Sequence, residues 1–233
     1  MEMKYHLFLF DLDDTLLDFR ASERLSFVRA LRSMGVSHEI EELFKYYQVE
    51  NAALWKLFEE NKTTKEHLKV ERFRKVFNHF GIEMNPELAS NRYLEALPET
   101  VVLMDQAVEL CAWLKDFGEI GVITNGIQSV QSQRIQNSGI APFISFVSVS
   151  DECGFPKPDV RFFEFTVKKA KQFDKSSTII IGDREEADIL GAHNFGIDSC
   201  WFNPHQKVSS VKVHPTFEIA HLSELRAHLL GKL

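Results

Sequence analysis

Two aspartates at the end of an apolar run have the residue types and the spacing that chemistry requires. Leu7 to Phe10 form a short apolar segment, and Asp11, Asp13 and Asp14 follow it. Such a segment is typical of a strand buried in a parallel sheet, where chemistry takes place beyond the carboxyl ends of the strands. Asp11 and Asp13 are two residues apart, so an extended backbone points both side chains the same way. Converging carboxylates are costly unless they share a cation or a proton. The pair therefore indicates a metal site, an acid–base pair or both, and the alternative is a solvated acidic turn.

A second apolar run, residues 120–123, ends in Thr124, Asn125 and Gly126, and a helical pattern then continues to Gly139. A junction between a strand and a helix presents free backbone N–H groups and the positive end of the helix dipole, which suit an anion such as phosphate. The Thr124 hydroxyl can add one donor. An ordinary capped turn is the alternative.

A third segment places Lys157 between two prolines, Pro156 and Pro158, which restrict the backbone on both sides of it. Pro158 is expected to be the first residue of the following helix. A lysine at a helix start opposes the helix dipole, so we expect an anion or nearby carboxylates to compensate its charge. The alternative is a solvated lysine in a turn.

A fourth segment is a β-branched run, residues 178–181, followed by Gly182 and Asp183, with Asp188 little more than one helical turn further on. More carboxylates at a strand end suit a hard divalent cation, which takes oxygen ligands and keeps some water. Acids enriched at a helix start are the alternative. That alternative accounts for Glu185 better than for Asp183, which directly follows the strand.

In this order, the four segments resemble the four motifs of the haloacid dehalogenase superfamily, and the resemblance spans nearly the whole chain. The residues that carry it are Asp11, Asp13 and Thr15, then Thr124, Asn125 and Gly126, then Lys157, and finally Gly182, Asp183 and Asp188. Further segments resemble the bacterial pyrimidine 5′-nucleotidase subfamily. These are residues 123–126, Asn51 with Leu54 and Trp55, residues 188–191, and residues 200–203 followed by His205.

The elements that must position these residues fall into two blocks. After residue 98, strand-like and helical segments alternate, which is the pattern of a doubly wound parallel sheet. Residues 18–97 contain helical patterns and no convincing strand. We therefore expect an α/β fold, a Rossmann-like parallel sheet formed by residues 1–17 and 98–233, with an inserted all-helical domain at 18–97. In the resembling family such an insertion is a mobile cap over the active site.

Apolar residues at helical spacing define the helices of the inserted block. The stripes run from Leu25 through Val28 and Leu31, with Phe27 and Met34 beside them, from Ile40 to Phe58, and from Leu68 to Phe80. Asn85-Pro86 begins a fourth helix that ends near Leu97. Gly35 and Gly81 are expected to stop the first and third helices.

The resemblance implies a mechanism. Asp11 is then the nucleophile that forms an aspartyl-phosphate, and Asp13 is the general acid and base. Mg²⁺ is then held by Asp11, the backbone carbonyl of Asp13, and Asp183. Asp188 either positions a water on the metal or braces Lys157.

The same resemblance implies how the phosphate is bound. Thr124, the backbone N–H of Asn125 with the Gly126 turn, and Lys157 neutralise the phosphate oxygens. Phe19 and Arg20, just past the first motif, are predicted to contact the substrate.

The presence of Asp13 favours hydrolysis of a phosphate ester, because an alkoxide leaving group needs a proton donor. Relatives that cleave carbon–halogen bonds lack an acid two residues past the nucleophile. The substrate expected from the subfamily resemblance is a small phosphate ester, namely a pyrimidine nucleoside 5′-monophosphate. A sugar-phosphate phosphatase, a phosphomutase and a non-catalytic binding module are the alternatives.

Composition limits the possible partners. The chain has 233 residues, of which 44% are hydrophobic and 26% charged, as in ordinary globular proteins. Its net charge of −7 argues against nucleic-acid binding, and no apolar run is long enough to span a bilayer. The 3 cysteines are scattered, which fits reduced thiols better than disulfides or a zinc site. We expect a cytoplasmic enzyme with no nucleic-acid or membrane partner.

Overall fold

The computed structural model describes residues 3–36 and 39–231. The chain forms two compact units. One consists of Met1–Phe19 together with Val102–Leu233, and the other is the continuous segment Arg20–Val101. The second unit is thus inserted between the first strand of the sheet and the rest of it.

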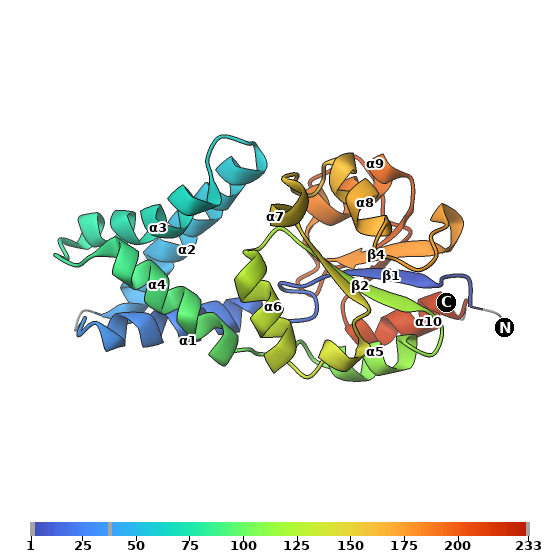
Figure 1. Ribbon diagram of the computed structural model, residues 1–233, viewed down its shortest axis with the longest axis horizontal. Coiled ribbons are helices and arrows are strands. Elements are labelled where there is room, and N and C mark those ends of the chain that lie inside the picture. Colours follow the sequence, from blue (N-terminus) through green and yellow to red (C-terminus); the bar gives the residue numbers. More distant parts are fainter. Residues whose placement is uncertain (1–2, 37–38, 232–233) are drawn as a thin grey trace. The chain divides into compact units, whose positions relative to one another are not determined.

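The first unit is built on a six-stranded sheet in the order β3-β2-β1-β4-β5-β6 (Figure 1). All neighbouring strands are parallel. The strands are β1 (Leu7–Asp11), β2 (Glu119–Thr124), β3 (Phe146–Val149), β4 (Thr178–Gly182), β5 (Asp198–Phe202) and β6 (Phe217–Ile219). The N-terminal strand is therefore central, and its carboxyl end lies between those of β2 and β4.

Helices cover both faces of this sheet (Figure 1). They are α5 (Ala107–Leu114), α6 (Gln128–Asn137), α7 (Ser150–Cys153), α8 (Val160–Val167), α9 (Leu190–Phe195) and α10 (Leu225–Leu229). Leu7 and Leu9 of β1 pack in one cluster with Phe162 and Phe163 of α8. Phe8, on the opposite face of β1, is also fully buried. Burial of both faces explains why the strand is apolar at every position before Asp11.

The second unit consists of α1 (Phe19–Ser33), α2 (Ile40–Glu59), α3 (Lys65–Phe80) and α4 (Pro86–Ala96). The predicted stops and caps are confirmed. Gly35 and Gly81 have φ of 77° and 64°, and the Asn85 side chain accepts from the N–H groups of Glu87 and Leu88. Such left-handed conformations suit glycine, which has no Cβ to clash.

Two local predictions are wrong. In α1 the predicted Phe27 and Leu31 are buried together with Ala30, but Leu25, with which the predicted stripe began, is 45% exposed. Ser22 and Ser26 complete the buried face, and a search for apolar residues alone misplaces it. The helix after Lys157 begins at Val160 rather than at Pro158, because the Asp159 side chain accepts from Arg161 N–H and caps it.

The helical unit buries a polar chain that links three of its helices. Asn51 of α2 donates to Glu23 of α1 at 2.8 Å and accepts from Arg72 of α3 at 3.1 Å. All three residues are at most 6% exposed. Asn51 thus lies between a buried acid and a buried base. It is one of the residues that carry the subfamily resemblance, and these contacts give it a structural role.

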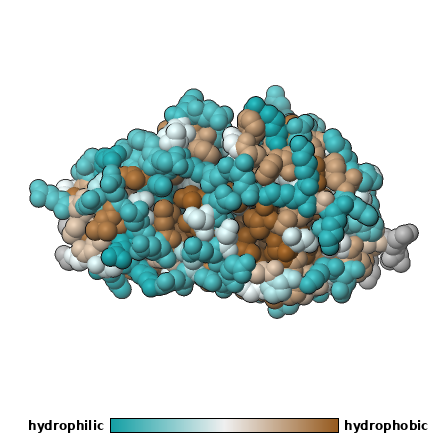
Figure 2. Space-filling view, viewed as in Figure 1, coloured by the Kyte–Doolittle hydropathy of each residue, from teal (hydrophilic) through white to brown (hydrophobic). Residues whose placement is uncertain are grey.

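On the face shown in Figure 2, each unit is mostly hydrophilic, with smaller hydrophobic areas. Among the described residues, no helix has both the length and the apolar character needed to cross a membrane.

Candidate active site

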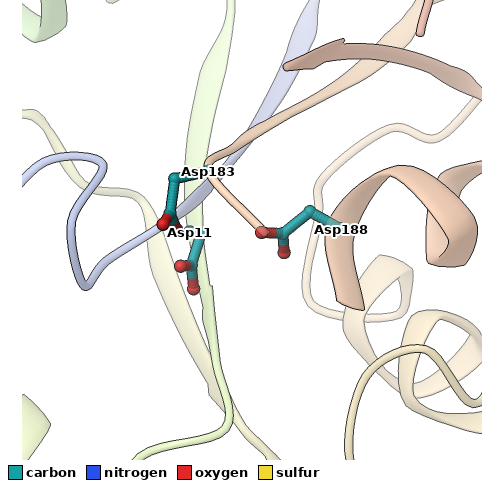
Figure 3. A group of neighbouring side chains, drawn as sticks. All are labelled: Asp11, Asp183 and Asp188. Atoms are coloured by element: carbon teal, nitrogen blue, oxygen red, sulfur yellow. The ribbon is translucent and has the colours of Figure 1, made fainter. Parts of the chain in front are cut away.

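Three carboxylates gather at the carboxyl ends of the central strands. Asp11 ends β1, Asp183 directly follows β4, and Asp188 lies in the short helical turn after it, Glu185–Ile189. The ligand oxygens of these three residues lie within 4.8 Å of one another. Figure 3 shows Asp188 turned toward Asp11 and Asp183. The spacing is close to the roughly 4 Å that separates opposite oxygens around one Mg²⁺, which binds oxygen at about 2.0–2.1 Å.

Lys157 completes this cluster. Its Nζ donates to Asp11 Oδ1 at 2.6 Å, to Asp188 Oδ1 at 2.7 Å and to the backbone oxygen of Ile123 at 3.1 Å. These three bonds use all three N–H donors of the ammonium group. Nearby carboxylates therefore compensate the charge of Lys157, as the sequence predicts, although the helix itself begins only at Val160.

Burial makes the carboxylates hard to ionise together. Burial raises the pKa of Asp11 to about 7, the charge of Lys157 opposes this rise, and Asp188 adds to it. Burial and the neighbouring Asp11 and Asp188 raise the pKa of Asp183 to about 8. For Lys157, burial alone would lower the pKa, but Asp11 and Asp188 outweigh it and raise the pKa above its ordinary value.

The cluster fits a divalent cation on two observations. Asp183 Oδ1 is buried and has no hydrogen-bond partner. In addition, the three carboxylates lie close together, and two of them share the single ammonium group of Lys157, so the cluster carries more negative charge than that group balances. Hard oxygen ligands with this excess charge suit Mg²⁺.

The loop after β4 fixes the two acids differently. The Trp201 indole N–H donates to the backbone oxygen of Asp183 at 3.1 Å, which orients that residue without using its carboxylate. Asp188 accepts from Lys157 and, through Oδ2, from Arg184 N–H at 3.2 Å. A Cβ on Gly182 would lie 2.2 Å from Asp188 Oδ2, so only glycine leaves room for that carboxylate. Asp188 thus braces Lys157, one of the two roles expected for it.

Thr124 and Asn125 lie at the end of β2. The Thr124 hydroxyl oxygen accepts from Gly126 N–H at 3.0 Å and from Gln131 at 2.9 Å, so its proton remains available to an anion. The Asn125 side chain donates to the backbone oxygen of Lys157 and accepts from Lys157 N–H. The side chain of Asn125 thereby ties the Lys157 loop to β2, a role the sequence did not reveal.

Asp13 has partners that sequence reasoning missed. Because β1 ends at Asp11, Asp13 lies outside the strand, and its carboxylate pairs with α6 rather than with Lys157. Arg134 donates to Asp13 Oδ1, and Gln131 donates to Oδ2 at 2.7 Å. The available signal was the spacing of α6, where Gln131 and Arg134 adjoin the apolar positions Val130 and Ile135 on one face.

The turn after the first motif depends on Asp14 and Phe19. Asp14 has φ of 56°, and its side chain accepts from Phe19 N–H at 3.0 Å. The Phe19 ring lies 5.2 Å from the Arg134 guanidinium carbon, which is a cation–π contact. Phe19 thus adjoins the groups that hold Asp13. Arg20 is exposed and belongs to the helical unit, and its contact with substrate stays a prediction.

Comparison with known proteins gives three kinds of match. The family model for haloacid dehalogenase-like hydrolases matches residues 8–202. The HAD-hydrolase YfnB of Bacillus subtilis is 36% identical over 98% of this chain and 96% of its own length. A crystal structure of YfnB bound to magnesium, described as revealing interdomain movement, superposes with a TM-score of 0.91 over 97% of this chain and 99% of that one.

Among the relatives that carry a named activity, two are pyrimidine 5′-nucleotidases that match nearly the whole chain. PynA of Streptococcus pneumoniae, a pyrimidine 5′-nucleotidase, is 36% identical over 96% of this chain and 94% of its own length. YjjG of Escherichia coli, also a pyrimidine 5′-nucleotidase, is 29% identical over 96% of this chain and 97% of its own length.

Proposed function

Because the chain belongs to the haloacid dehalogenase-like hydrolase family, we propose that it is a magnesium-dependent phosphomonoester hydrolase that acts through a phosphorylated Asp11. One observation carries the proposal. Asp11, at the end of the central strand, shares its surroundings with two further carboxylates and with the ammonium group of Lys157. This arrangement offers a nucleophile, a cation site and a fixed positive charge in one place.

Each protein group has a defined task in the first half-reaction. An Asp11 carboxylate oxygen attacks phosphorus, and the bond from phosphorus to the ester oxygen breaks. Asp13 gives its proton to that leaving oxygen, so an alcohol departs rather than an alkoxide. The Thr124 hydroxyl and the backbone N–H of Asn125 donate to the phosphoryl oxygens, and Lys157 contributes its charge.

The second half-reaction returns the enzyme to its starting state. Asp13, now ionised, takes a proton from a water molecule, whose oxygen attacks the phosphorus of the aspartyl-phosphate. The bond from phosphorus to Asp11 breaks, and inorganic phosphate leaves. The same carboxyl group therefore acts first as an acid and then as a base.

Asp11, Asp183 and the backbone carbonyl of Asp13 are the groups we assign to Mg²⁺, with Asp188 bracing Lys157 beside them. When bound, the cation supplies positive charge that favours ionised Asp11 and stabilises the charge on the phosphoryl oxygens. The unpartnered Oδ1 of Asp183 and the raised pKa of both acids support this assignment.

The substrate we propose is a pyrimidine nucleoside 5′-monophosphate, and the two named nucleotidases, similar over nearly their whole lengths, support it. We further propose that the inserted helical unit acts as a mobile cap. Its place in the chain, between β1 and β2, supports this, as does the interdomain movement named for YfnB. Phe19 and Arg20 flank the division between the units, and we assign them to substrate contact.

The test is release of inorganic phosphate from a panel of phosphate esters. The panel comprises uridine and thymidine 5′-monophosphates, purine nucleotides and sugar phosphates, each with Mg²⁺ and with EDTA. We expect kcat/KM for the pyrimidine nucleotides to be at least about tenfold higher than for sugar phosphates, and EDTA to abolish turnover. The Asp11→Asn variant, purified in parallel, controls for a contaminating phosphatase.

The outcomes separate the alternatives. No phosphate release from any ester would overturn the proposal. A preference for sugar phosphates would retain the hydrolase and reject the nucleotide. Conversion of a sugar phosphate to its isomer without net phosphate release would identify a phosphomutase instead.

A further inference from the structure

We propose that Gln131 and Arg134 of α6 are positioning residues that hold the Asp13 carboxyl group for proton transfer to the leaving oxygen. This inference rests on the hydrolase activity proposed above. It concerns a helix that begins after the Thr124 turn and contains none of the residues assigned to the chemistry so far.

The three side chains form a closed ring of hydrogen bonds. Arg134 Nη1 donates to Asp13 Oδ1 and also to Gln131 Oε1, the latter at 2.8 Å. Gln131 Nε2 donates to Asp13 Oδ2 at 2.7 Å. Each oxygen of Asp13 thus has its own donor from α6, and the bond between the two donors fixes their relative orientation. The carboxyl plane of Asp13 is thereby defined.

The same ring reaches the phosphate-binding turn. The second N–H of Gln131 Nε2 donates to the Thr124 hydroxyl oxygen at 2.9 Å. Gln131 therefore links the proton donor to a group that binds the phosphoryl oxygens. A Cβ on Gly126 would lie 2.3 Å from Gln131 Nε2, so the glycine of this turn leaves the space that Gln131 occupies.

Burial indicates that this ring serves positioning rather than stability. The Arg134 side chain is 1% exposed, and its Nε and Nη2 atoms are buried without hydrogen-bond partners. Burying a guanidinium group in this way is costly, and an apolar side chain of similar volume often gives equal or greater stability. We therefore assign the buried charge of Arg134 to function rather than to stability.

The Asp13 side chain is 29% exposed, so it remains open on one side. A protonated carboxyl group has one O–H donor besides its acceptor positions, and the two α6 donors use one acceptor position on each oxygen. The O–H is therefore left to donate to a leaving oxygen. A carboxyl group held from behind in this way loses less conformational entropy in the transition state than a free one.

The experiment compares leaving groups of different acidity in a series of phenyl phosphates. A good leaving group such as 2,4-dinitrophenolate needs little help from an acid, whereas phenolate needs more. The proteins are wild type, Arg134→Met, Arg134→Lys, Gln131→Met, Asp13→Asn and the double variant Asp13→Asn/Arg134→Met. Arg226→Met is the control. Arg226 also lies over an aromatic ring, that of Trp113, and donates to an oxygen, the backbone oxygen of Glu109.

We expect Arg134→Met to lower kcat/KM for phenyl phosphate by about 10- to 100-fold, and for 2,4-dinitrophenyl phosphate by less than about threefold. Gln131→Met also releases Thr124, so it should lower kcat/KM for both esters, but by at least about tenfold more for phenyl phosphate. Arg134→Lys can still donate to Asp13, so its loss in kcat/KM for phenyl phosphate should be smaller than that of Arg134→Met. In the Asp13→Asn background, Arg134→Met changes kcat/KM by less than about twofold, because the group it positions is already gone. Arg226→Met leaves the whole series unchanged.

Equal losses for all leaving groups, or a full loss that persists in the Asp13→Asn background, would overturn the inference. An increase in kcat/KM in Arg134→Met would do the same. If Arg134→Met does not fold, Gln131→Met and Arg134→Lys decide the matter with the same series. Failure of the proposed function looks different, because wild type itself then releases no phosphate.

Discussion

Lys157 Nζ lies 2.6 Å from Asp11 Oδ1, although 146 positions separate the two residues in the chain. The contact closes a buried group of charges, because Lys157 also donates to fully buried Asp188. Removing Lys157 from this group leaves its buried carboxylates without compensation, which is more costly than losing an exposed ion pair. Substitution of Lys157 and substitution of Asp11 should therefore affect stability differently.

Lys157→Met is expected to destabilise the protein strongly, because it leaves Asp11 and Asp188 buried without their cation. In EDTA, the free energy of unfolding should fall by about 3–5 kcal/mol, and the melting temperature by about 10 °C. Lys4→Met is the control, because Lys4 forms an equally short ion pair with Asp198 but is 58% exposed. That control should lose less than about 1 kcal/mol. Equal losses in thermal melts of the two variants would contradict this account of the buried cluster.

Asp11→Asn is expected to abolish turnover and to preserve the fold. The amide cannot act as the nucleophile, so kcat should fall by about 10³-fold or more. It also removes one of the crowded negative charges, and its melting temperature in EDTA should therefore equal or exceed that of wild type. Phosphate release and circular dichroism measure the two effects. Substantial residual turnover in a folded Asp11→Asn variant would exclude Asp11 as the nucleophile.

Much of this site could be predicted from the sequence, because its principal residues follow runs that form strands. An apolar strand places its last residue at the edge of the sheet, and Asp11, Thr124 and Asp183 are each found at such a point. The resemblance to a known family added the order of the motifs and the roles. The fold class was predictable for the same reason, since buried parallel strands are continuous apolar segments.

The residues that were missed act from helices and through side chains without a sequence pattern of their own. Gln131 and Arg134 adjoin Val130 and Ile135 on one face of α6, but the contact with Asp13 that gives them a role is visible only in the folded structure. The buried face of α1 was misplaced because Ser22 and Ser26 contribute to it. Polar residues can be buried when their hydrogen bonds are satisfied, and these partners are not visible in a single sequence.

The metal-free protein should become less stable as the pH rises. Its Asp11 and Asp183 have pKa values of about 7 and about 8, against an ordinary value of 3.8. At a pH above the ordinary pKa but below the raised pKa, the folded protein holds protons that the unfolded chain has released. The free energy of unfolding therefore falls as the pH rises through this range. Asp183→Asn removes one such group. Its stability relative to wild type should rise from about pH 5 to about pH 8, by at most about 1.4 kcal/mol per pH unit.

Urea unfolding in EDTA across this range measures the effect, and Asp174→Asn is the control. A hydrogen bond from Ser176 lowers the pKa of Asp174, so this group is ionised in both states throughout the range. Its substitution should therefore shift the curve by a constant amount. Added Mg²⁺ should remove the decline in wild type but not in Asp183→Asn. The raised pKa of Asp183 would be contradicted if, without metal, the free energy of unfolding of wild type rose with pH relative to that of Asp183→Asn.

Gly126→Ala tests whether the turn glycine exists to accommodate Gln131. The new Cβ would lie 2.3 Å from Gln131 Nε2, so the amide must move away from Asp13 and Thr124. We expect kcat/KM for phenyl phosphate to fall about tenfold or more. Gly35→Ala is the contrasting variant, because its Cβ meets nothing within 4 Å but its φ is +77°. It should lose about 1 kcal/mol of stability and keep its kinetics.

Adding Gln131→Ala to Gly126→Ala removes the clash and so distinguishes this explanation from general damage to the turn. If displacement of Gln131 is the cause, the double variant should have the kcat/KM of Gln131→Ala alone, within about twofold. If instead the new methyl group disturbs the backbone N–H groups that bind phosphate, the two losses should multiply. Initial-rate measurements on the four proteins decide between the two, because only the first result leaves Gln131 as the link between Gly126 and the proton donor Asp13.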